Sequence, residues 1–547
     1  MNLAIDFGTS FTKIGYMSDG HFNNLTGLNG LPSAFAYIRA KDQLLFGYNA
    51  LQLSGPDIYL FPNFKLELKR NLNFSVGSYN LAEILYHFFA FLDEEYIRPS
   101  HIAFTTISLA IPNYFGLNAR QLLIKTLDRI YPKSIIYLIP EPVAALAGHI
   151  IVNKNEEIDG DILVIDMGGG TSDFSFLTFS SEDTEIIIES QVQMGQDVFS
   201  GLEIDKAILH HILLPSLKGK TNIERLDSSY RRLLKLAETI KIQVSNHGHF
   251  YINEPDLLPG YSFIEEFKDT HILKVVNSAL TKLRQYFINH IVGMAKNLGL
   301  YNGIWKLDKV LLLGGTSKTI GIHSFWANIF HPTTVNQPLD KTLNVVKGLA
   351  VWPEIMNSPI NIKTIYPFNF YIQTLENNSY QLESIHFDTS MLELDIHGQY
   401  TIFSFPVNSI YNLSDNKNEL KLKIYEVAEE NEANLDRFIG QEIVLDLQEP
   451  IYDGNQYIEV KLNFSSAELT ADFIQVNPQS PKTSFPELAL EIEADWLTFI
   501  EGIDLISPEF KQDLSDFLHG DLTTAQPVSS QLEFMKFKLL TLLNYIS

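Results

Sequence analysis

The stretch Asp-Met-Gly-Gly-Gly-Thr-Ser-Asp at residues 166–173 directly follows a continuous apolar run, Ile-Leu-Val-Ile, at residues 162–165. Such a run is typical of a strand that is buried on both faces, and α/β sheets usually place ligands at the carboxyl ends of these strands. Three consecutive glycines let the backbone approach an oxyanion closely, and the flanking carboxylates can hold a hydrated cation. The stretch therefore predicts a phosphate-binding hairpin.

A second stretch of the same kind, Asp-Phe-Gly-Thr-Ser, occupies residues 6–10 after the apolar residues 3–5. Alone, an Asp-x-Gly-Thr string is more often a tight structural turn. Two such hairpins in one chain are far more specific, and we expect the amides and hydroxyls of both to face phosphate groups. Short apolar runs alternate with helical stretches in the first third of the chain, which predicts an α/β fold with a mixed sheet.

Composition limits the class of protein. A chain of 547 residues, 45% hydrophobic and 19% charged, should form two or three domains, each with a substantial core. Apolar runs stay shorter than the ~20 residues needed to cross a bilayer, so we expect no membrane span. The chain enters an apolar strand at once and lacks the pattern of a secretory signal. It has no cysteine, which excludes disulfides, and a cytoplasmic protein is expected.

The charge is unevenly distributed. The formal net charge of −25 argues against a nucleic-acid partner, because phosphate binding needs clustered lysine and arginine. Residues 1–351 hold 34 acidic and 30 basic residues, whereas residues 352–547 hold 31 and 10. The acidic part is either a well-solvated surface or a surface that steers basic partners or client segments.

Further segments follow in the order found in the superfamily of actin, sugar kinases and heat-shock ATPases, which this chain resembles. Residues 139–148, Ile-Pro-Glu-Pro-Val-Ala-Ala-Leu-Ala-Gly, resemble the first connecting helix, and residues 345–350 resemble the second. Residues 310–318, Val-Leu-Leu-Leu-Gly-Gly-Thr-Ser-Lys, resemble the adenosine segment. The resemblance implies an α/β actin-like ATPase fold, with two related lobes around a nucleotide cleft and one hairpin from each lobe clamping ATP around magnesium.

Three more matches resemble the 70-kilodalton heat-shock chaperones, the heat shock protein 70 family. Residues 62–66, Pro-Asn-Phe-Lys-Leu, resemble the segment that presents a lysine to the γ-phosphate, and residues 200–205, Ser-Gly-Leu-Glu-Ile-Asp, resemble the family's Gly-Gly-x-Asp-x-Asp segment with two departures. Glu238, Lys241 and Ser245 match adenine and ribose contacts. Their spacing of three and four residues lets one helical face present all three.

The resemblance implies roles for single residues. Lys65 would neutralise charge on the transferred phosphoryl group, and Glu141, with Asp166 as a competing candidate, would orient or activate the attacking water. Asp6 and Asp166 would hold magnesium through water. Thr171 belongs to the catalytic set because it would bind a phosphate oxygen. The implied nucleotide contacts are Gly8, Thr9, Ser10, Gly168, Gly169, Gly170, Thr171, Glu238, Lys241, Ser245, Gly314, Gly315, Thr316 and Lys318, where Lys318 replaces the family's usual arginine.

We expect four regions. An actin-like ATPase domain at 1–352 and a linker at 353–362 are followed by a β-sandwich substrate-binding-like domain at 363–480, because strand-like alternation follows Trp352. Residues 487–547 suggest a short helical lid-like region, too short for the family's full lid. Residues 353–359 lack the family's charged, leucine-rich linker, which argues against coupling between the domains. Tyr137 replaces an arginine used by J-domain cochaperones, which argues against the standard cochaperone partnership.

The sequence favours an ATP-binding, slowly ATP-hydrolysing chaperone-like protein that binds unfolded or specific protein clients through its β domain. Two alternatives stay open. A filament-forming or scaffolding actin-like ATPase is one, since residues 10–15, Ser-Phe-Thr-Lys-Ile-Gly, also resemble plasmid-segregation actins. A small-molecule kinase is the other, although the helix that carries Glu238, Lys241 and Ser245 favours the chaperones.

Overall fold

The computed structural model describes two compact units. The first holds the elements up to strand β19 (Ile360–Thr364) together with β22 (Leu392–Glu393), and the second holds β20, β21 and β23 to β27. Residues 487–547, where we expect a lid-like region, lie outside the described residues. The structure describes residues 1–476 except 28–29, 54, 113–114, 153–159, 183–184, 197–198, 218–227, 259–260, 333, 337–341, 357–359, 365–367, 377–378, 386–391, 394–398, 407–418, 429–438, 447–456 and 465–468.

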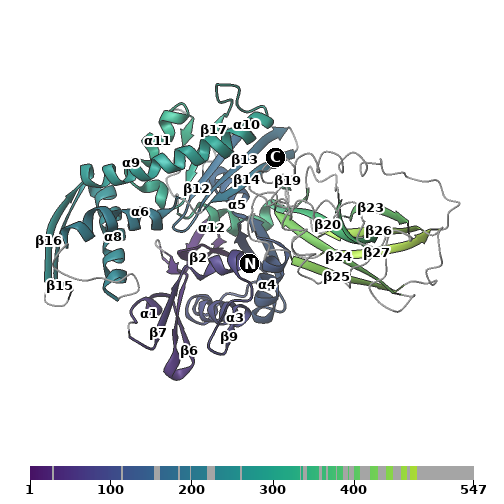
Figure 1. Cartoon of the computed structure of the whole chain (residues 1–547), viewed down its shortest axis with the longest axis horizontal. Coiled ribbons are helices and arrows are strands. Elements are labelled where there is room, and N and C mark those ends of the chain that lie inside the picture. Colours follow the sequence, from purple (N-terminus) through teal and green to yellow (C-terminus); the bar gives the residue numbers. More distant parts are fainter. Residues whose placement is uncertain are drawn as a thin grey trace, which may run out of the picture. The chain divides into compact units, whose positions relative to one another are not determined.

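The first lobe is built on a sheet with the strand order β11-β10-β1-β2-β3, and the short β4 pairs with β2 (Figure 1). The pairs β11–β10 and β10–β1 are parallel, and β1–β2 and β2–β3 are antiparallel. The first predicted phosphate hairpin is the turn between β1 and β2. The strands are β1 (Asn2–Phe7), β2 (Phe11–Ser18), β3 (His21–Asn24), β4 (Leu31–Pro32), β10 (Thr106–Ile111) and β11 (Ile135–Pro140).

The second lobe repeats this arrangement. Its sheet begins with the order β18-β17-β12-β13-β14, in which β18–β17 and β17–β12 are parallel and β12–β13 and β13–β14 antiparallel. The second predicted hairpin is the turn between β12 and β13, equivalent to the first. The lobes are therefore related, as the resemblance implied. The strands are β12 (Gly160–Met167), β13 (Ser172–Glu182), β14 (Glu185–Gln196), β17 (Lys309–Leu313) and β18 (Val335–Asn336).

The expected linker range, 353–362, overlaps two regular elements. Most of helix α13 (Trp352–Met356) falls in it, and β19 begins in it. Strand β19 pairs in parallel with β14 and extends the second sheet, and β22 pairs antiparallel with β19. The compact first unit thus continues to Thr364, beyond the expected domain end at residue 352.

Two helices lie between the two sheets, α5 (Glu141–Val152) and α12 (Asn344–Ala350). They pack against each other in a core of their own, which contains Ala144, Val164 and Leu349, while separate cores fill the two lobes. The predicted connecting helices are therefore these two. Asn2 fixes the end of α12, because its Nδ2 donates to the carbonyl oxygen of Leu349 at 2.7 Å.

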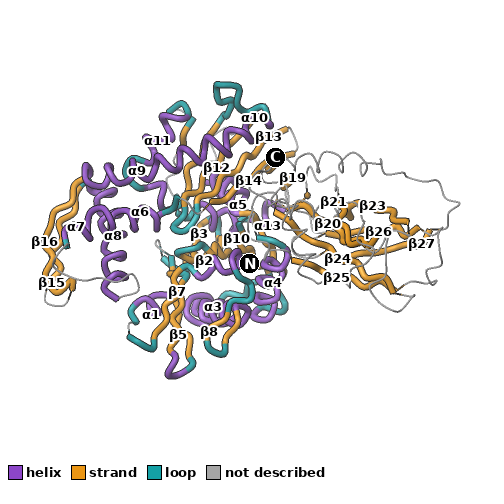
Figure 2. Tube along the Cα trace, viewed as in Figure 1, coloured by secondary structure: helices purple, strands orange, loops and turns teal. Residues whose placement is uncertain are grey.

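Smaller elements complete the first unit (Figure 2). Helix α3 starts at a capping box in which Asn80 and Glu83 each accept from the other's backbone amide, which satisfies two amides at the helix start. Among the described helices, none is long and apolar enough to cross a membrane. The helices are α1 (Gly47–Leu51), α2 (Glu67–Arg70), α3 (Leu81–Leu92), α4 (Leu117–Ile130), α6 (Gly201–Ile208), α7 (Leu214–Ser216), α8 (Ser228–His247), α9 (Asp269–Tyr286), α10 (Val292–Asn297) and α11 (Ile322–Ile329), and the strands are β5 (Ala34–Ile38), β6 (Gln43–Phe46), β7 (Ile58–Pro62), β8 (Ser75–Val76), β9 (Tyr79–Asn80), β15 (His249–Leu258) and β16 (Tyr261–Lys268).

The second unit contains two sheets, with the orders β21-β20-β24-β25 and β23-β26-β27. The pairs β20–β21, β20–β24, β24–β25 and β23–β26 are antiparallel. These strands occupy the range in which strand-like alternation predicts a β domain. They are β20 (Phe368–Glu376), β21 (Ser379–Ile385), β23 (Gln399–Pro406), β24 (Glu419–Ala428), β25 (Ile439–Asp446), β26 (Tyr457–Phe464) and β27 (Leu469–Val476).

Candidate active site

The tips of the two hairpins lie against each other. A Cβ atom added to Gly169 would collide with the hydroxyl of Ser10, and one added to Gly170 would lie 2.5 Å from the methyl carbon of Thr9. A side chain at either position would therefore have to displace a side chain of the opposite hairpin. The contact brings the residues predicted to bind phosphate, from segments 160 residues apart in sequence, to one place.

The second hairpin is fixed by elements from two other segments. The amides of Gly201 and Leu202, at the start of α6, donate to the carbonyl oxygens of Gly168 and Gly169 at 3.1 and 2.9 Å. The hydroxyl of Thr316, in the predicted adenosine segment, also donates to the Gly168 carbonyl, at 2.8 Å. The carbonyl oxygens of Gly168 and Gly169 thus accept hydrogen bonds from donors of the protein itself. The predicted adenosine segment contacts the hairpin directly.

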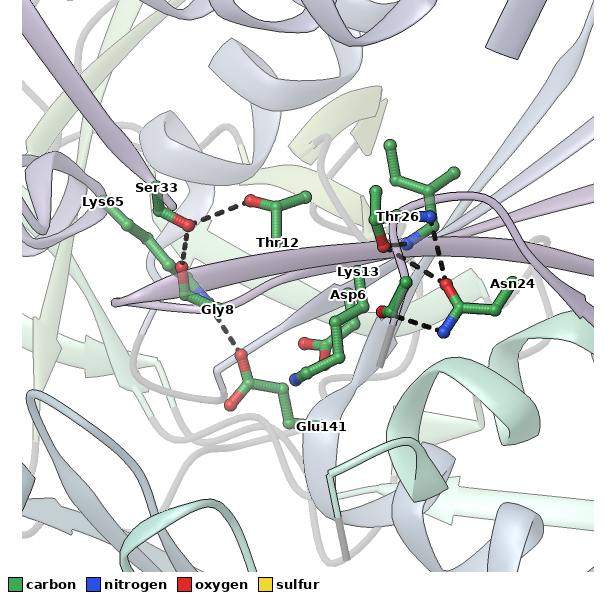
Figure 3. Close-up of polar contacts among 11 residues, drawn as sticks. Asp6, Gly8, Thr12, Lys13, Asn24, Thr26, Ser33, Lys65 and Glu141 are labelled. Atoms are coloured by element: carbon green, nitrogen blue, oxygen red, sulfur yellow. Dashed lines mark hydrogen bonds and ion pairs between the residues drawn. The ribbon is translucent and has the colours of Figure 1, made fainter. Parts of the chain in front are cut away.

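The first hairpin is held by Ser33, a buried residue that follows β4 (Figure 3). Its hydroxyl donates to the carbonyl oxygen of Gly8 at 2.7 Å and lies 2.9 Å from the hydroxyl of Thr12. Its amide donates to the carbonyl oxygen of Ser10 at 2.9 Å. The sequence offered no sign of Ser33, because its contact with the hairpin depends on how the chain returns after β3.

Two lysines of the first lobe meet carboxylates at this place (Figure 3). The Nζ atom of Lys65 lies 2.7 Å from Oε1 of Glu141, so that the two predicted catalytic residues form an ion pair. Lys65 is only 2% exposed, and its ammonium lies 5.6 Å from the ring centroids of Phe7 and Phe115. Two aromatic rings thus lie beside the ion pair.

The second lysine, Lys13, was absent from the predicted site. Its Nζ atom lies 2.8 Å from Oδ2 of Asp6. Burial alone would lower the pKa of Lys13, but the charges of Asp6, Asp166 and Glu141 and the hydrogen bond to Asp6 outweigh it and raise that pKa above its usual value. A signal was available in the sequence, since counting outward from the hairpin turn places Lys13 directly opposite Asp6.

Negative charge is in excess at this place. The pKa of Asp166 is raised to about 7, first by burial and then by the charges of Glu141 and Asp6. The pKa of Asp173 is raised to about 8, first by burial and then by the charges of Glu141 and Asp166. Asp173 also accepts a hydrogen bond from the hydroxyl of Thr171 at 3.1 Å. Four carboxyl groups therefore face Lys13 and Lys65, and Lys69 is a further positive charge that acts on Asp173.

These carboxylates suit a magnesium ion held through water, because among the described residues no three acidic or histidine side chains are grouped closely enough to hold a metal ion by themselves. Carboxylate oxygens are the protein ligands that magnesium prefers, and a divalent cation would stabilise the ionised forms of these carboxyl groups. Burial first, and then the neighbouring negative charges, make Asp166 and Asp173 resist ionisation, and a further positive charge would favour their ionised forms.

The three residues expected on one face of α8 have separate partners. The Nζ atom of Lys241 lies 2.9 Å from Oδ1 of Asp205 and donates to the carbonyl oxygen of Gly201 at 3.1 Å. Glu238 pairs with Lys235 at 2.6 Å, and the hydroxyl of Ser245 accepts from the amide of Ile320 at 3.1 Å.

The pair of Lys241 and Asp205 links α8 to the helix that supports the second hairpin. Both side chains are 8% exposed. The pKa of Asp205 is raised to about 6 because burial outweighs the attraction of Lys241. The sequence placed Asp205 in the segment at residues 200–205 that resembles a family motif, but it predicted no partner for this residue.

Gly314, in the predicted adenosine segment, packs against the strand that leads into the second hairpin. Gly314 has a φ of +76°, and a Cβ atom there would collide with Oδ1 of Asp166 and the carbonyl oxygen of Met167. Gly315 precedes the short 3₁₀ turn at Thr316–Lys318, and Lys318 is its last residue. The segment thus lies beside the carboxylates, and Gly314 is needed to admit them.

Each lobe contains a hairpin, two parallel strands and a connecting helix. Together they define a two-lobed α/β protein whose charged residues lie where the hairpin tips meet. The family model described as Hsp70 protein matches residues 91–470, more than half of the chain. This chain belongs to the Hsp70 family, whose members are ATPases of actin-like fold that bind ATP or ADP with magnesium.

Two relatives illustrate the degree of similarity. The chain is 24% identical over 275 residues to the chaperone protein DnaK of Methanothermobacter thermautotrophicus (strain Delta H), a match that covers 49% of this chain and 44% of the relative. It is 26% identical over 276 residues to the chaperone protein dnaK of Guillardia theta, covering 49% of this chain and 42% of the relative. The match spans less than half the length of these relatives.

Proposed function

We propose that this protein binds ATP with magnesium where the two hairpin tips meet and hydrolyses it slowly to ADP and phosphate as part of a chaperone-type cycle. The observation that carries the proposal is the contact of Thr9 and Ser10 with Gly169 and Gly170, beside a cluster of four carboxyl groups and two lysines. Family membership supports the chaperone class.

The hairpins bind the phosphates in this proposal. The turns at residues 8–10 and 168–171 supply backbone amides, and Thr9, Ser10 and Thr171 supply hydroxyls. Backbone amides in such turns form concave sites for anions without any positive side chain. Asp6 and Asp166 would hold a magnesium ion through water, and the ion would neutralise charge on the β- and γ-phosphates.

Lys65 and Glu141 act on the transferred group. Lys65 turns from Glu141 toward the γ-phosphate and offsets the charge that develops there. Glu141 then has a free oxygen with which to orient the attacking water, and Asp166 is a competing candidate for that step. Because this chemistry depends on positioning alone, turnover is slow.

The nucleoside is bound between α8 and the segment at residues 314–318. We assign Glu238, Lys241 and Ser245 to this face, with Gly314, Gly315, Thr316 and Lys318 opposite. The present partner of Lys241, Asp205, connects this face to the second hairpin through α6, because the start of α6 donates to Gly168 and Gly169.

We assign client binding to the second unit, whose two β-sheets follow the ATPase unit in sequence. Support comes from the two relatives, both named as chaperones, and from the family match, which continues to residue 470. The client is an unfolded or a specific protein segment. Tyr137 stands at the position of the arginine that J-domain cochaperones use, which argues against a standard J-domain cochaperone.

The Lys65→Ala variant tests the catalytic assignment. With magnesium and ATP, we expect turnover to fall by about 100-fold or more while affinity for ADP changes by less than about threefold, since Lys65 acts on the transition state. Lys41→Ala, an exposed lysine in a 3₁₀ turn, is the matched control. Unchanged turnover in Lys65→Ala would refute the assignment.

ATP-dependent release of a fluorescent unfolded peptide tests the chaperone class. The full chain should bind the peptide and release it faster with ATP, and a shortened chain that ends after Thr364 should not bind it. The end point follows from β19, which belongs to the first unit. If the full chain fails to bind peptide, the client-binding assignment is wrong.

A further inference from the structure

Ser33 holds the turn of the first hairpin at both of its ends. Its hydroxyl donates to the carbonyl oxygen of Gly8 at 2.7 Å (Figure 3), and its amide donates to the carbonyl oxygen of Ser10 at 2.9 Å. A hydroxyl has only one hydrogen to donate, so the hydroxyl of Thr12, 2.9 Å away, donates to Ser33 and does not accept from it. Ser33 and Thr12 are both fully buried, so bulk water does not compete for these bonds.

The second hairpin has a hydroxyl contact at the equivalent position. Gly8 and Gly168 each follow an aspartate by two residues. The carbonyl oxygen of Gly168 accepts from the hydroxyl of Thr316 at 2.8 Å, as that of Gly8 accepts from Ser33. The two hydroxyls come from unlike places, Ser33 from the segment after β4 and Thr316 from the turn after β17. A contact that unlike segments make in both lobes points to a role in what the hairpins share.

The direction of these carbonyls fixes the direction of the amides that follow them. The C=O and N–H groups of one trans peptide unit lie in one plane and point in opposite directions. Because the carbonyl of Gly8 is bonded to Ser33, the amide of Thr9 points away from Ser33. In the same way, Thr316 turns the amide of Gly169 away from itself. These two amides belong to the hairpin tips that meet, where the proposed function places the phosphates.

We propose that Ser33 is a positioning residue of the nucleotide site, which turns the peptide unit between Gly8 and Thr9 so that its amide donates to a nucleotide phosphate. Ser33 is buried and does not touch the nucleotide itself. Without its hydroxyl this peptide unit can rotate, and ordering it when the phosphate binds costs affinity. Thr316 has the same role at Gly168. The inference rests on the proposed function and adds to it a residue that acts on the phosphates alone.

The test compares ADP with adenosine, which has no phosphate. In Ser33→Ala, we expect the affinity for ADP with magnesium to fall by about tenfold, because a hydrogen bond to a charged phosphate is weakened. Affinity for adenosine, measured by displacement of a fluorescent ADP analogue, should change by less than about twofold, since adenosine makes no contact with the turn. Ser108→Ala is the matched control, because Ser108 is equally buried on β10 and its hydroxyl donates to Oδ1 of Asn2 at 3.1 Å. That variant should bind both ligands as the wild type does.

The amide of Thr9 can also be followed in the wild type, which keeps the inference testable if Ser33→Ala fails to fold. In isotope-labelled protein, hydrogen exchange at this amide, measured by NMR, should slow by about tenfold or more when ADP is added, because the phosphate accepts its hydrogen. Adenosine should leave the exchange rate unchanged. In folded Ser33→Ala, ADP should protect the Thr9 amide less. The melting temperature of the variant reports whether it folds.

The outcomes are distinct. Equal losses of affinity for ADP and adenosine in Ser33→Ala, no loss for either, or a loss of the same size in Ser108→Ala would overturn this inference and leave the proposed function intact. Binding of ADP that leaves hydrogen exchange at the Thr9 amide unchanged would overturn it as well. If the wild type binds no ADP with magnesium, the proposed function fails, and this inference fails with it.

Discussion

Gly148 on α5 and Gly348 on α12 meet where the two connecting helices cross. A Cβ atom on Gly148 would lie 3.0 Å from the amide nitrogen of Gly348, and one on Gly348 would lie 2.8 Å from the amide nitrogen of Gly148. Each would also collide with a carbonyl oxygen of the opposite helix, that of Asn344 or Ala144. The helices pack backbone to backbone, so the lobes are joined at a point that tolerates no side chain.

Replacing Gly348 by alanine should therefore force the helices apart. We expect the Gly348→Ala variant to lower the free energy of unfolding of the first unit by about 3 kcal/mol, at the upper end of overpacking costs. Gly293→Ala on α10 is the control, since a Cβ atom there meets no atom within 4 Å. That variant should gain about 0.5–1 kcal/mol from helix propensity. Urea unfolding followed by circular dichroism measures both, and equal effects would contradict the crossing described here.

The contact between the hairpin tips can be tested by a paired substitution. Gly170→Ala places a methyl group 2.5 Å from Cγ2 of Thr9, so it should push the tips apart and weaken nucleotide binding by about tenfold or more. Thr9→Ser removes that methyl carbon and keeps the hydroxyl. The double variant should recover most of the lost affinity. If Thr9→Ser brings no recovery in a fluorescence titration, then contact with Thr9 is not the cause of the loss.

The raised pKa values of Asp166 and Asp173 predict how stability changes with pH. Each group keeps a proton in the folded protein up to about pH 7 or 8, whereas the unfolded chain releases it near pH 4. Unfolding therefore releases protons between these limits, and the free energy of unfolding should fall as pH rises through this window, by about 1.4 kcal/mol per pH unit for each such group.

Urea unfolding of the nucleotide-free protein between pH 5 and pH 8 measures this slope. Asp173→Asn should flatten it, and Asp19→Asn, on the exposed turn after β2, should leave it unchanged. Added magnesium should also flatten the slope, since a divalent cation favours the ionised carboxylates. A steeper slope in Asp173→Asn would contradict the assignment of these pKa values.

Lys241 should have a structural role as well as the proposed nucleoside contact. Lys241→Met leaves Asp205 buried without its partner, and we expect a loss of about 3–5 kcal/mol in the free energy of unfolding. The double variant Lys241→Met with Asp205→Asn removes both charges and should regain most of that stability. Nucleotide affinity should stay low in the double variant. Full recovery of nucleotide affinity would show that Lys241 has a structural role and does not contact the nucleoside.

Much of the first unit was predictable because its signals are local. An apolar strand, a glycine-containing turn and a returning strand form a hairpin from residues a few positions apart, so the turns at residues 8–10 and 168–171 followed from the sequence. The order of the segments gave the resemblance, and the family match confirmed it. The strand-like alternation after residue 363 likewise predicted strands that the structure contains.

The partners of single side chains were harder to predict from the sequence. The three residues expected on one face of α8 do share a helix, but Lys241 pairs with Asp205, 36 positions away, and Ser245 accepts from Ile320. Sequence spacing fixes which residues share a face, whereas packing against other elements fixes what that face meets. Ser33 was missed for the same reason, and Lys13 was missed because its partner, Asp6, lies across the hairpin on the neighbouring strand.

The sequence by itself determined the two hairpins and the membership of the Hsp70 family, because these depend on short segments and their order. Tertiary structure alone decided that Gly148 and Gly348 meet, that Lys65 pairs with Glu141 76 residues away and that Asn2 binds the end of α12. Each of these contacts joins segments far apart in the chain. Their geometry is set by how the two lobes pack around the connecting helices, and no local pattern encodes it.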